Sequence, residues 1–294
     1  MAKQVFVGVA TALVTPFKPD LSIDKKAFCR LVDRQVASRV SALVVGGTTG
    51  EGATLSIKEK LYLTEAALER SGDVPVIAAF CANDTRAAIK AASALDRVGA
   101  AALLVITPYY NKTSDNGLIR HFFTIADSVK TPVIVYNVPA RTGMNVTPAQ
   151  YKKLSLHKNI IGIKEADCDV VKATMALSAV KKDFFAYSGS DEAFLPFLVI
   201  GGKGIISVAA NVIPNALSSV YSAFSRGDVT RAKNAYFEVY GLIRALFCQV
   251  NPIPVKYALS KAGLIKNCLR PPLLPLDEKY RKTVDKQLKI LNMI

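Results

Sequence analysis

Eight short runs of apolar, largely β-branched residues recur along the chain, and an amphipathic stretch follows each run. Within these stretches the apolar positions have helical spacing, as at Phe28, Leu31, Val32 and Val36. The runs are continuous rather than alternating, which is typical of parallel strands buried on both faces of a sheet. The predicted strands are residues 5–14, 42–45, 74–79, 101–106, 133–136, 160–163, 184–187 and 204–208.

Eight strand-and-helix units in this order predict an α/β fold, the (β/α)8 TIM barrel, which needs about 250 residues. A doubly wound sheet is the alternative, but it seldom contains eight evenly spaced units. From about residue 214 onward only helical patterns remain, with Pro-rich breaks at 251–254 and 271–272. We therefore expect a catalytic barrel domain over residues 1–226. Residues 227–294 are expected to form a small C-terminal helical appendage rather than an independent domain.

Helix starts carry recognisable capping residues. Ser56 with Glu59 three positions later predicts a capping box, and Thr147-Pro148 places proline at the first helical position. The longest apolar runs fall far short of the roughly 20 residues that span a bilayer. Residues 1–6 lead directly into a strand-like run without a hydrophobic signal core. These features favour a cytoplasmic protein with no membrane partner.

The formal net charge of +15 raises the question of nucleic-acid binding. The Lys and Arg residues are scattered, and no nucleic-acid module or arginine-rich arm is present, so we expect no nucleic-acid partner. A solvated basic surface that draws in anionic substrates is the favoured interpretation. The five cysteines and two histidines show no metal-ligand spacing, which predicts free thiols and neither a metal nor a cofactor.

A glycine-rich turn follows the second predicted strand, at the end of the barrel where TIM-barrel chemistry takes place. Residues 46–52 are not a P-loop, because Ala53-Thr54 stands where Lys-Ser/Thr is required. Backbone N–H groups and the hydroxyls of Thr48 and Thr49 would suit a carboxylate there. A tight turn capped by a threonine is an equally good interpretation of these residues alone.

Lys164 follows the apolar run 160–163, so its amine is expected to project into the barrel mouth. Burial disfavours a charged amine, and a neutral amine can attack a carbonyl to form an imine. The alternative is a lysine that ends a strand in solvent, which is common.

Other polar side chains are expected at the same rim. Tyr136 and Tyr110 end neighbouring strands, and Thr48 could link the two phenols into a proton relay. Each tyrosine could instead be a packing aromatic. Arg141, five residues past Tyr136, could clamp a second carboxylate through two hydrogen bonds or lie on the loop surface.

These segments closely resemble the dihydrodipicolinate synthase (4-hydroxy-tetrahydrodipicolinate synthase) family of pyruvate-dependent class I aldolases. They occur in the family's order and spacing over nearly the whole chain. The matching segments are Gly47-Thr48-Thr49-Gly50-Glu51, Thr107-Pro108-Tyr109-Tyr110-Asn111, Tyr136-Asn137-Val138-Pro139 with Arg141-Thr142-Gly143, Ile161 with Ile163-Lys164-Glu165-Ala166, Ser188-Gly189 and Asn251-Pro252-Ile253-Pro254-Val255-Lys256.

The resemblance implies a lyase that condenses pyruvate with L-aspartate 4-semialdehyde through a Schiff base on Lys164. The product would be 4-hydroxy-tetrahydrodipicolinate, an intermediate of lysine and diaminopimelate biosynthesis. The resemblance implies catalytic roles for Lys164, Tyr136, Thr48 and Tyr110. It implies substrate-binding roles for Thr49, Arg141, Gly189 and Ile206.

The resemblance also implies what these residues do. Tyr136, Thr48 and Tyr110 would form the proton relay, with Tyr110 crossing into a neighbouring subunit of a homo-oligomer, a dimer or tetramer. Thr48 and Thr49 would hold the pyruvate carboxylate and Arg141 that of the semialdehyde. Gly189 and Ile206 would line the pocket with backbone groups.

Two other functions remain open at this stage. One is a pyruvate-dependent aldolase or lyase for N-acetylneuraminate or 2-keto-3-deoxy sugar acids, although such relatives usually lack the arginine motif. The other is a barrel that binds its ligand without catalysis. Borohydride trapping and substrate profiling separate these functions from the synthase.

The sequence departs from the family pattern in two places. Phe80-Cys81 stands where many relatives carry a Gly-Thr-Gly run near the subunit interface. In lysine-inhibited relatives a glutamate and histidines bind lysine near Tyr109 and Asn83. Here Ala87 replaces the glutamate, and Ile57 and Lys60 replace the histidines, so a cationic effector would lose its carboxylate partner and meet a like charge. We therefore predict weak or absent lysine inhibition.

Overall fold

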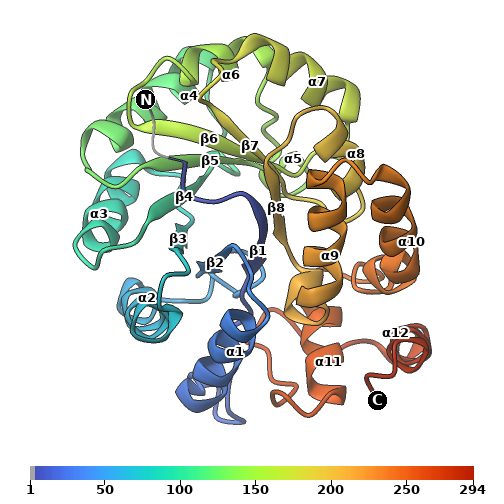
Figure 1. The fold of residues 1–294 in the computed structure, drawn as a ribbon. Helices are drawn as coiled ribbons and strands as arrows, with labels where there is room; N and C mark the ends of the chain where they lie inside the picture. The colour runs from blue at the N-terminus through green and yellow to red at the C-terminus, as the bar shows by residue number, and fades with distance from the viewer. Residues whose placement is uncertain (1–3) are drawn as a thin grey trace.

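The computed structural model describes residues 4–294 and shows a closed barrel of parallel strands (Figure 1). Each strand pairs with the next in sequence order, and β8 returns to pair with β1. The strands are β1 (Gly8–Ala12), β2 (Ala42–Val45), β3 (Val76–Phe80), β4 (Ala102–Ile106), β5 (Val133–Asn137), β6 (Ile160–Glu165), β7 (Phe185–Ser188) and β8 (Gly204–Ser207). The predicted TIM barrel is confirmed.

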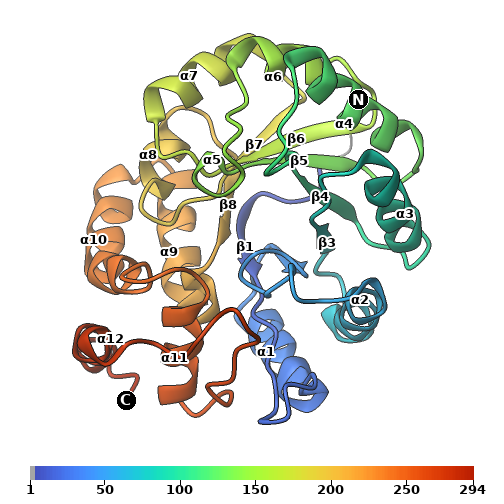
Figure 2. The same cartoon turned by 180° about the vertical axis from the view of Figure 1, so that it is seen from behind.

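Helices surround the barrel, which explains why the strands read as continuous apolar runs (Figures 1 and 2). Both predicted helix starts are confirmed: Ser56 and Glu59 form reciprocal capping bonds, and Pro148 lies at the start of its helix. A second capping box between Thr147 and Gln150 was not predicted. The helices are α1 (Lys25–Ala37), α2 (Ile57–Ser71), α3 (Thr85–Asp96), α4 (Asp115–Asp127), α5 (Pro139–Thr142), α6 (Pro148–Leu154), α7 (Val170–Ala179), α8 (Phe194–Val199), the 3₁₀ helix η1 (Ala209–Asn211), α9 (Pro214–Ser225), α10 (Val229–Ala245), α11 (Ile253–Lys261) and α12 (Glu278–Ile290).

Every predicted strand overlaps an observed one, and two boundaries differ for a physical reason. β1 ends at Ala12, although residues 13–17 are also buried. A buried loop has the same apolar composition as a strand, so the pattern could not separate them. β6 runs beyond the predicted end to include Lys164 and Glu165, which pair with Tyr136 and Asn137 of β5. Polar residues therefore complete this strand.

The C-terminal helices pack onto the barrel through one hydrophobic cluster. This cluster joins Val9 of β1 and Ile205 of β8 to Leu242 of α10 and to Val284 and Leu288 of α12. In Figures 1 and 2, α10 lies beside α9, and α11 lies between α1 and α12. The division at residue 226/227 falls in the turn between α9 and α10 and stays a prediction.

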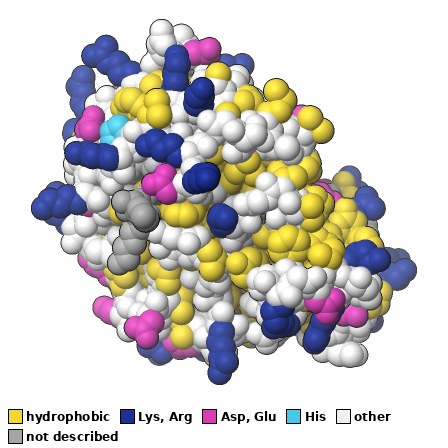
Figure 3. Space-filling view, turned by 45° about the horizontal axis from the view of Figure 1, so that its top comes forward, with side chains coloured by type: hydrophobic (Ala, Val, Ile, Leu, Met, Phe, Trp, Pro, Cys, Tyr) yellow, Lys and Arg dark blue, Asp and Glu magenta, His cyan; other side chains and the backbone are white. Residues whose placement is uncertain are grey.

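Basic side chains do not gather into one patch on the face shown in Figure 3. Lys and Arg side chains are interspersed there with apolar and acidic ones. Within residues 4–294, no helix has the length and apolar character needed to cross a membrane.

Candidate active site

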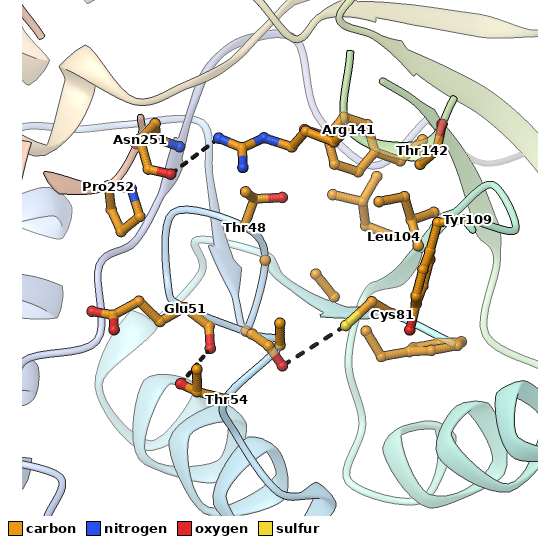
Figure 4. A pocket seen from close by; sticks show the side chains of 18 of the residues that line it. Thr48, Glu51, Thr54, Cys81, Leu104, Tyr109, Arg141, Thr142, Asn251 and Pro252 are labelled. Carbon is orange, nitrogen blue, oxygen red and sulfur yellow. Dashed lines mark hydrogen bonds between the residues drawn. The ribbon is translucent and has the colours of Figure 1, made fainter. Parts of the chain in front are cut away.

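A cavity of about 310 Å³ opens beside the C-terminal ends of β2 to β5 (Figure 4). Its volume is within the range of small-molecule sites. Its polar groups include Thr48 in the turn after β2, Arg141 of α5, and Asn251 in the segment before α11. Tyr136 of β5 forms part of its wall, and Pro272 and Leu273 bring the C-terminal region to its rim.

Lys164 lies against the tyrosine of this wall. The strand register pairs Lys164 with Tyr136, and the lysine Nζ is 4.2 Å from the centre of the Tyr136 ring. Lys164 is only 6% exposed, so its amine is held out of bulk water in contact with an aromatic face. An amine in this position is a suitable nucleophile for a carbonyl.

Gly189 leaves room for this lysine. A Cβ atom at position 189 would lie 3.0 Å from Cε of Lys164 and 2.7 Å from Cβ of Ala166. Both distances are shorter than ordinary van der Waals contact, so a larger residue would displace the lysine chain or the turn after β6. The predicted site residues Gly189 and Lys164 are therefore neighbours.

A buried carboxylate supports β6 from the outer side. Glu165 accepts hydrogen bonds from the Tyr151 hydroxyl (2.6 Å), the Asn137 side-chain amide (2.8 Å) and the Asp167 N–H (2.8 Å). Burial raises the pKa of Glu165. Successive strand residues point to opposite faces, so this network fixes the strand while Lys164 faces inward. Sequence reasoning missed Tyr151 and Asn137 as members of the network.

A second buried carboxylate fixes the ends of β7 and β8. Asp191 accepts hydrogen bonds from the Ser207 hydroxyl and from the N–H groups of Val208 (2.9 Å) and Ala209 (3.2 Å). Burial raises the pKa of Asp191, and the nearby charge of Lys164 opposes that change. Asp191 also had no predicted role, although the sequence places it two residues after the strand-end pair Ser188-Gly189.

The glycine-rich turn is anchored by the C-terminal region. Thr49 is buried, and its hydroxyl accepts a hydrogen bond from the side-chain amide of Asn251 (3.1 Å). Glu51 makes a fully buried ion pair with Lys256 of α11 (2.5 Å). Burial lowers the pKa of Lys256, and the charge of Glu51 opposes this effect. The turn is therefore held in place by residues some 200 positions away in the chain.

Arg141 extends across the cavity toward Asn251, as Figure 4 shows, and its Nη2 donates to the Asn251 carbonyl (3.0 Å). Thr48 lies on the same side of the cavity in this view. A guanidinium and a hydroxyl-bearing turn thus face one space, and each suits a carboxylate.

Of the eight predicted site residues, Thr48, Tyr136 and Arg141 line this cavity. Lys164, Thr49 and Gly189 do not line it, but they lie beside Tyr136, Asn251 and Lys164, respectively. Tyr110 and Ile206 lie elsewhere. Tyr110 is 86% exposed with a left-handed φ of 68°, and its side chain does not line the cavity of its own chain, whereas the adjacent Tyr109 does. Ile206 is fully buried in the barrel core with Tyr136 and Tyr187 rather than at the cavity wall. One chain therefore brings Tyr136 and Thr48 to the site but not Tyr110.

The first of the two sequence departures lies at the edge of the same cavity. Phe80 and Cys81 both line it, and the Cys81 thiol donates to the Gly52 carbonyl (3.8 Å). The Asn83 side chain donates to the Tyr109 carbonyl (3.2 Å), so these two residues lie together as expected. Burial lowers the pKa of Lys60.

No group of three or more His, Cys, Asp or Glu side chains suited to a metal ion occurs among the residues that the structure describes. The donors gathered here are an amine, a guanidinium, hydroxyls and amides. A TIM barrel with a buried lysine amine at the end of β6 is typical of one class of enzyme, the barrels that form an imine with their substrate.

The comparisons with known proteins identify the family within this class. Residues 5–291 match the model of the Dihydrodipicolinate synthetase family, and the chain belongs to that family. A 4-hydroxy-tetrahydrodipicolinate synthase from Alkaliphilus oremlandii is 42% identical over 291 residues, which cover 99% of this chain and all of the relative.

Solved structures agree with this assignment. The dihydrodipicolinate synthase of Thermotoga maritima has a TM-score of 0.97 at 37% identity, with 99% of this chain and 100% of that chain covered. The chloride-inhibited dihydrodipicolinate synthase of Acinetobacter baumannii, solved in complex with pyruvate, has a TM-score of 0.96 at 37% identity and the same coverage.

Proposed function

We propose that this chain is a lyase that condenses pyruvate with L-aspartate 4-semialdehyde to give 4-hydroxy-tetrahydrodipicolinate, for lysine and diaminopimelate biosynthesis. The observation that carries the proposal is the buried Lys164 amine against Tyr136 at the wall of the cavity. The synthase names of its relatives and the pyruvate bound by the Acinetobacter baumannii protein support it.

The reaction begins with the amine of Lys164. Its nitrogen attacks the C2 carbonyl of pyruvate, and loss of water leaves an imine. The hydroxyls of Thr48 and Thr49 and the N–H groups of the glycine-rich turn hold the pyruvate carboxylate during this step. Loss of a proton from the methyl carbon then converts the imine to an enamine.

The second half of the reaction forms the carbon–carbon bond. The enamine carbon attacks the aldehyde, whose oxygen takes up a proton, and the amino group of the semialdehyde then displaces the lysine from the imine carbon. Tyr136 and Thr48 carry protons between these groups, with Tyr110 as the third member of the relay. Arg141 holds the semialdehyde carboxylate.

Arg141 distinguishes this reaction from a sugar-acid aldolase. With the parent protein and Arg141→Ala, turnover is measured for aspartate semialdehyde, N-acetylneuraminate and a 2-keto-3-deoxy sugar acid. The proposal expects turnover of the first substrate only, and its loss in the variant. Turnover of a sugar acid by the parent, or indifference to the substitution, would favour the aldolase instead.

We propose that the active unit is a homo-oligomer, a dimer or a tetramer, in which Tyr110 reaches the site of a neighbouring subunit. Its exposed, outward position supports this arrangement. Mixing Tyr110→Phe and Lys164→Ala subunits tests it, because a mixed pair contains one complete site. Recovery of activity after subunit exchange is the expected result, and two variants that stay inactive together would contradict it.

We also place the reaction in the cytoplasm. All five cysteines of the chain are free, which suits a reducing compartment. The basic surface attracts the pyruvate anion, and no nucleic-acid partner is proposed.

A further inference from the structure

Asn251 contacts Thr49 and Arg141, the two residues to which the proposed function assigns one substrate carboxylate each. It lies just before α11, lines the cavity and is 8% exposed. Its side-chain Nδ2 donates to the Thr49 hydroxyl (3.1 Å), and its backbone carbonyl accepts from Arg141 (3.0 Å). Its Oδ1 is buried without a hydrogen-bond partner, so the amide makes a single side-chain hydrogen bond, the one to Thr49.

This bond determines how the Thr49 hydroxyl is used. A hydroxyl has one hydrogen to donate and lone pairs to accept with. Because Asn251 supplies the donor, the Thr49 oxygen acts as acceptor in that contact and its own hydrogen stays available. A carboxylate has only acceptors, so it needs this hydrogen.

We propose that Asn251 is a positioning residue, whose amide keeps the Thr49 hydroxyl oriented to donate to the pyruvate carboxylate. The inference rests on the proposed function, in which that carboxylate lies against Thr48 and Thr49. Asn251 does not itself touch pyruvate. It acts through Thr49, and its backbone carbonyl independently holds Arg141.

The Asn251 side chain can be substituted without releasing the glycine-rich turn. The glycine-rich turn is tied to α11 by the Glu51–Lys256 ion pair, and the Arg270 N–H also donates to Glu51 (2.9 Å). These contacts do not involve the Asn251 amide, so substitutions there leave the turn anchored. Thermal unfolding of each variant checks that the fold is intact.

The informative comparison is between Asn251→Ala and Asn251→Asp. Alanine removes the donor and leaves the hydroxyl free to rotate, whereas aspartate has the same shape but only accepts. The carboxylate introduced by the second substitution would capture the Thr49 hydrogen. A hydrogen bond to a charged group is stronger than one between neutral groups, so we expect weaker pyruvate binding by about 10-fold for alanine and more for aspartate.

The readout is the pyruvate concentration that half-saturates borohydride trapping on Lys164, together with the KM of each substrate. Asn251→Ala should raise both the half-saturating pyruvate concentration and the KM for pyruvate. The KM for the semialdehyde should stay within about twofold of the parent value, because the backbone carbonyl still holds Arg141. Equal increases for both substrates, or an aspartate variant that binds pyruvate as the parent does, would refute the inference and indicate a packing role.

A double-mutant cycle with Thr49→Val excludes simple charge repulsion. If the aspartate acts by capturing the hydroxyl, its extra penalty over alanine disappears in the valine background. If it repels pyruvate directly, the penalty persists in full, and the inference is wrong. Asn267→Asp is the matched control, because its Oδ1 is also buried and unpaired but Asn267 does not line the cavity.

The same experiment separates this inference from the proposed function. A parent protein that is not trapped by pyruvate and borohydride would refute the imine reaction itself. A parent that is trapped, with Asn251 variants that match it, would refute only the role of Asn251.

Discussion

Lys164 and Tyr136 occupy paired positions on the adjacent strands β6 and β5, and the lysine Nζ lies 4.2 Å from the centre of the tyrosine ring. The strand register sets this arrangement, so it does not depend on a mobile loop. The aromatic face shields the amine from water. The same pairing holds a phenol-bearing side chain beside any imine that forms on the lysine.

The space that Gly189 leaves for Lys164 predicts a sensitive position. Gly189→Ala would introduce a Cβ 3.0 Å from Cε of the lysine and 2.7 Å from Cβ of Ala166. Such overpacking costs about 1–3 kcal/mol, and relief requires the lysine chain to move. We expect the rate of imine trapping to fall by about 10-fold or more.

Rapid-quench trapping with pyruvate and borohydride measures this rate. Gly201→Ala is a steric control, since nothing lies within 4 Å of the added atom there, although its φ of 103° adds local strain. Unchanged trapping in the Gly189 variant would show that the lysine does not need this space.

Lys256→Met tests the anchoring of the glycine-rich turn. The substitution leaves the Glu51 carboxylate fully buried without its ion-pair partner. Breaking one side of a buried pair destabilises a protein by about 3–5 kcal/mol. Urea unfolding should show this loss, together with weaker pyruvate binding because Glu51 follows Thr48 and Thr49. The control is Lys261→Met, at an exposed position of the same helix, which should change the free energy of unfolding little. A similar loss of stability in both variants would contradict a specific role for the Glu51–Lys256 ion pair.

The Glu59–Arg270 ion pair predicts a pH-dependent contribution to stability. Hydrogen bonds from Arg270 are the main cause that lowers the pKa of Glu59 from 4.5 to about 2. A lowered carboxyl pKa stabilises the fold above the unfolded value, and that contribution is lost as the pH falls from about 4.5 through 2. Allowing for the partial exposure of the pair, we expect Glu59→Gln to cost about 1–2 kcal/mol at neutral pH.

Denaturant unfolding of both proteins across this pH range checks the prediction. Glutamine keeps the capping box with Ser56, so the comparison isolates the charge. The difference between parent and variant should close below pH 4.5. Glu65→Gln, at an exposed position on the same helix, should show no such trend, and a gap that stays constant with pH would contradict the assignment.

Lysine should inhibit this protein weakly or not at all. Asn83 and Tyr109 lie together as in the expected effector region, but Ala87 offers no carboxylate and Lys60 adds a basic group. A direct product assay with added L-lysine measures the effect, and Ala87→Glu should increase sensitivity. Strong inhibition of the parent at sub-millimolar lysine would refute this prediction.

Much of the fold was predictable because burial on both faces leaves a plain apolar signature in each strand. The strand-end motifs also located Lys164, Tyr136, Thr48 and Arg141 at one end of the barrel. The partners that position them were not predictable, since they depend on which distant side chains meet. Asn251 is 202 residues from Thr49, and no local pattern encodes that contact.

The placement of Tyr110 shows a different limit. Its sequence position indicated the barrel rim, but the direction of its side chain depends on a left-handed backbone conformation that a non-glycine residue seldom adopts. Its exposed position leaves the relay to be completed by another subunit, as proposed above.

The proposed reaction requires Lys164 to become covalently bound to pyruvate. Incubation with pyruvate and borohydride, followed by peptide mass mapping, tests it directly. We expect one reduced pyruvate adduct, located on Lys164 and absent from Lys164→Ala. An adduct on another lysine, or full condensation activity in the Lys164→Ala protein, would contradict it.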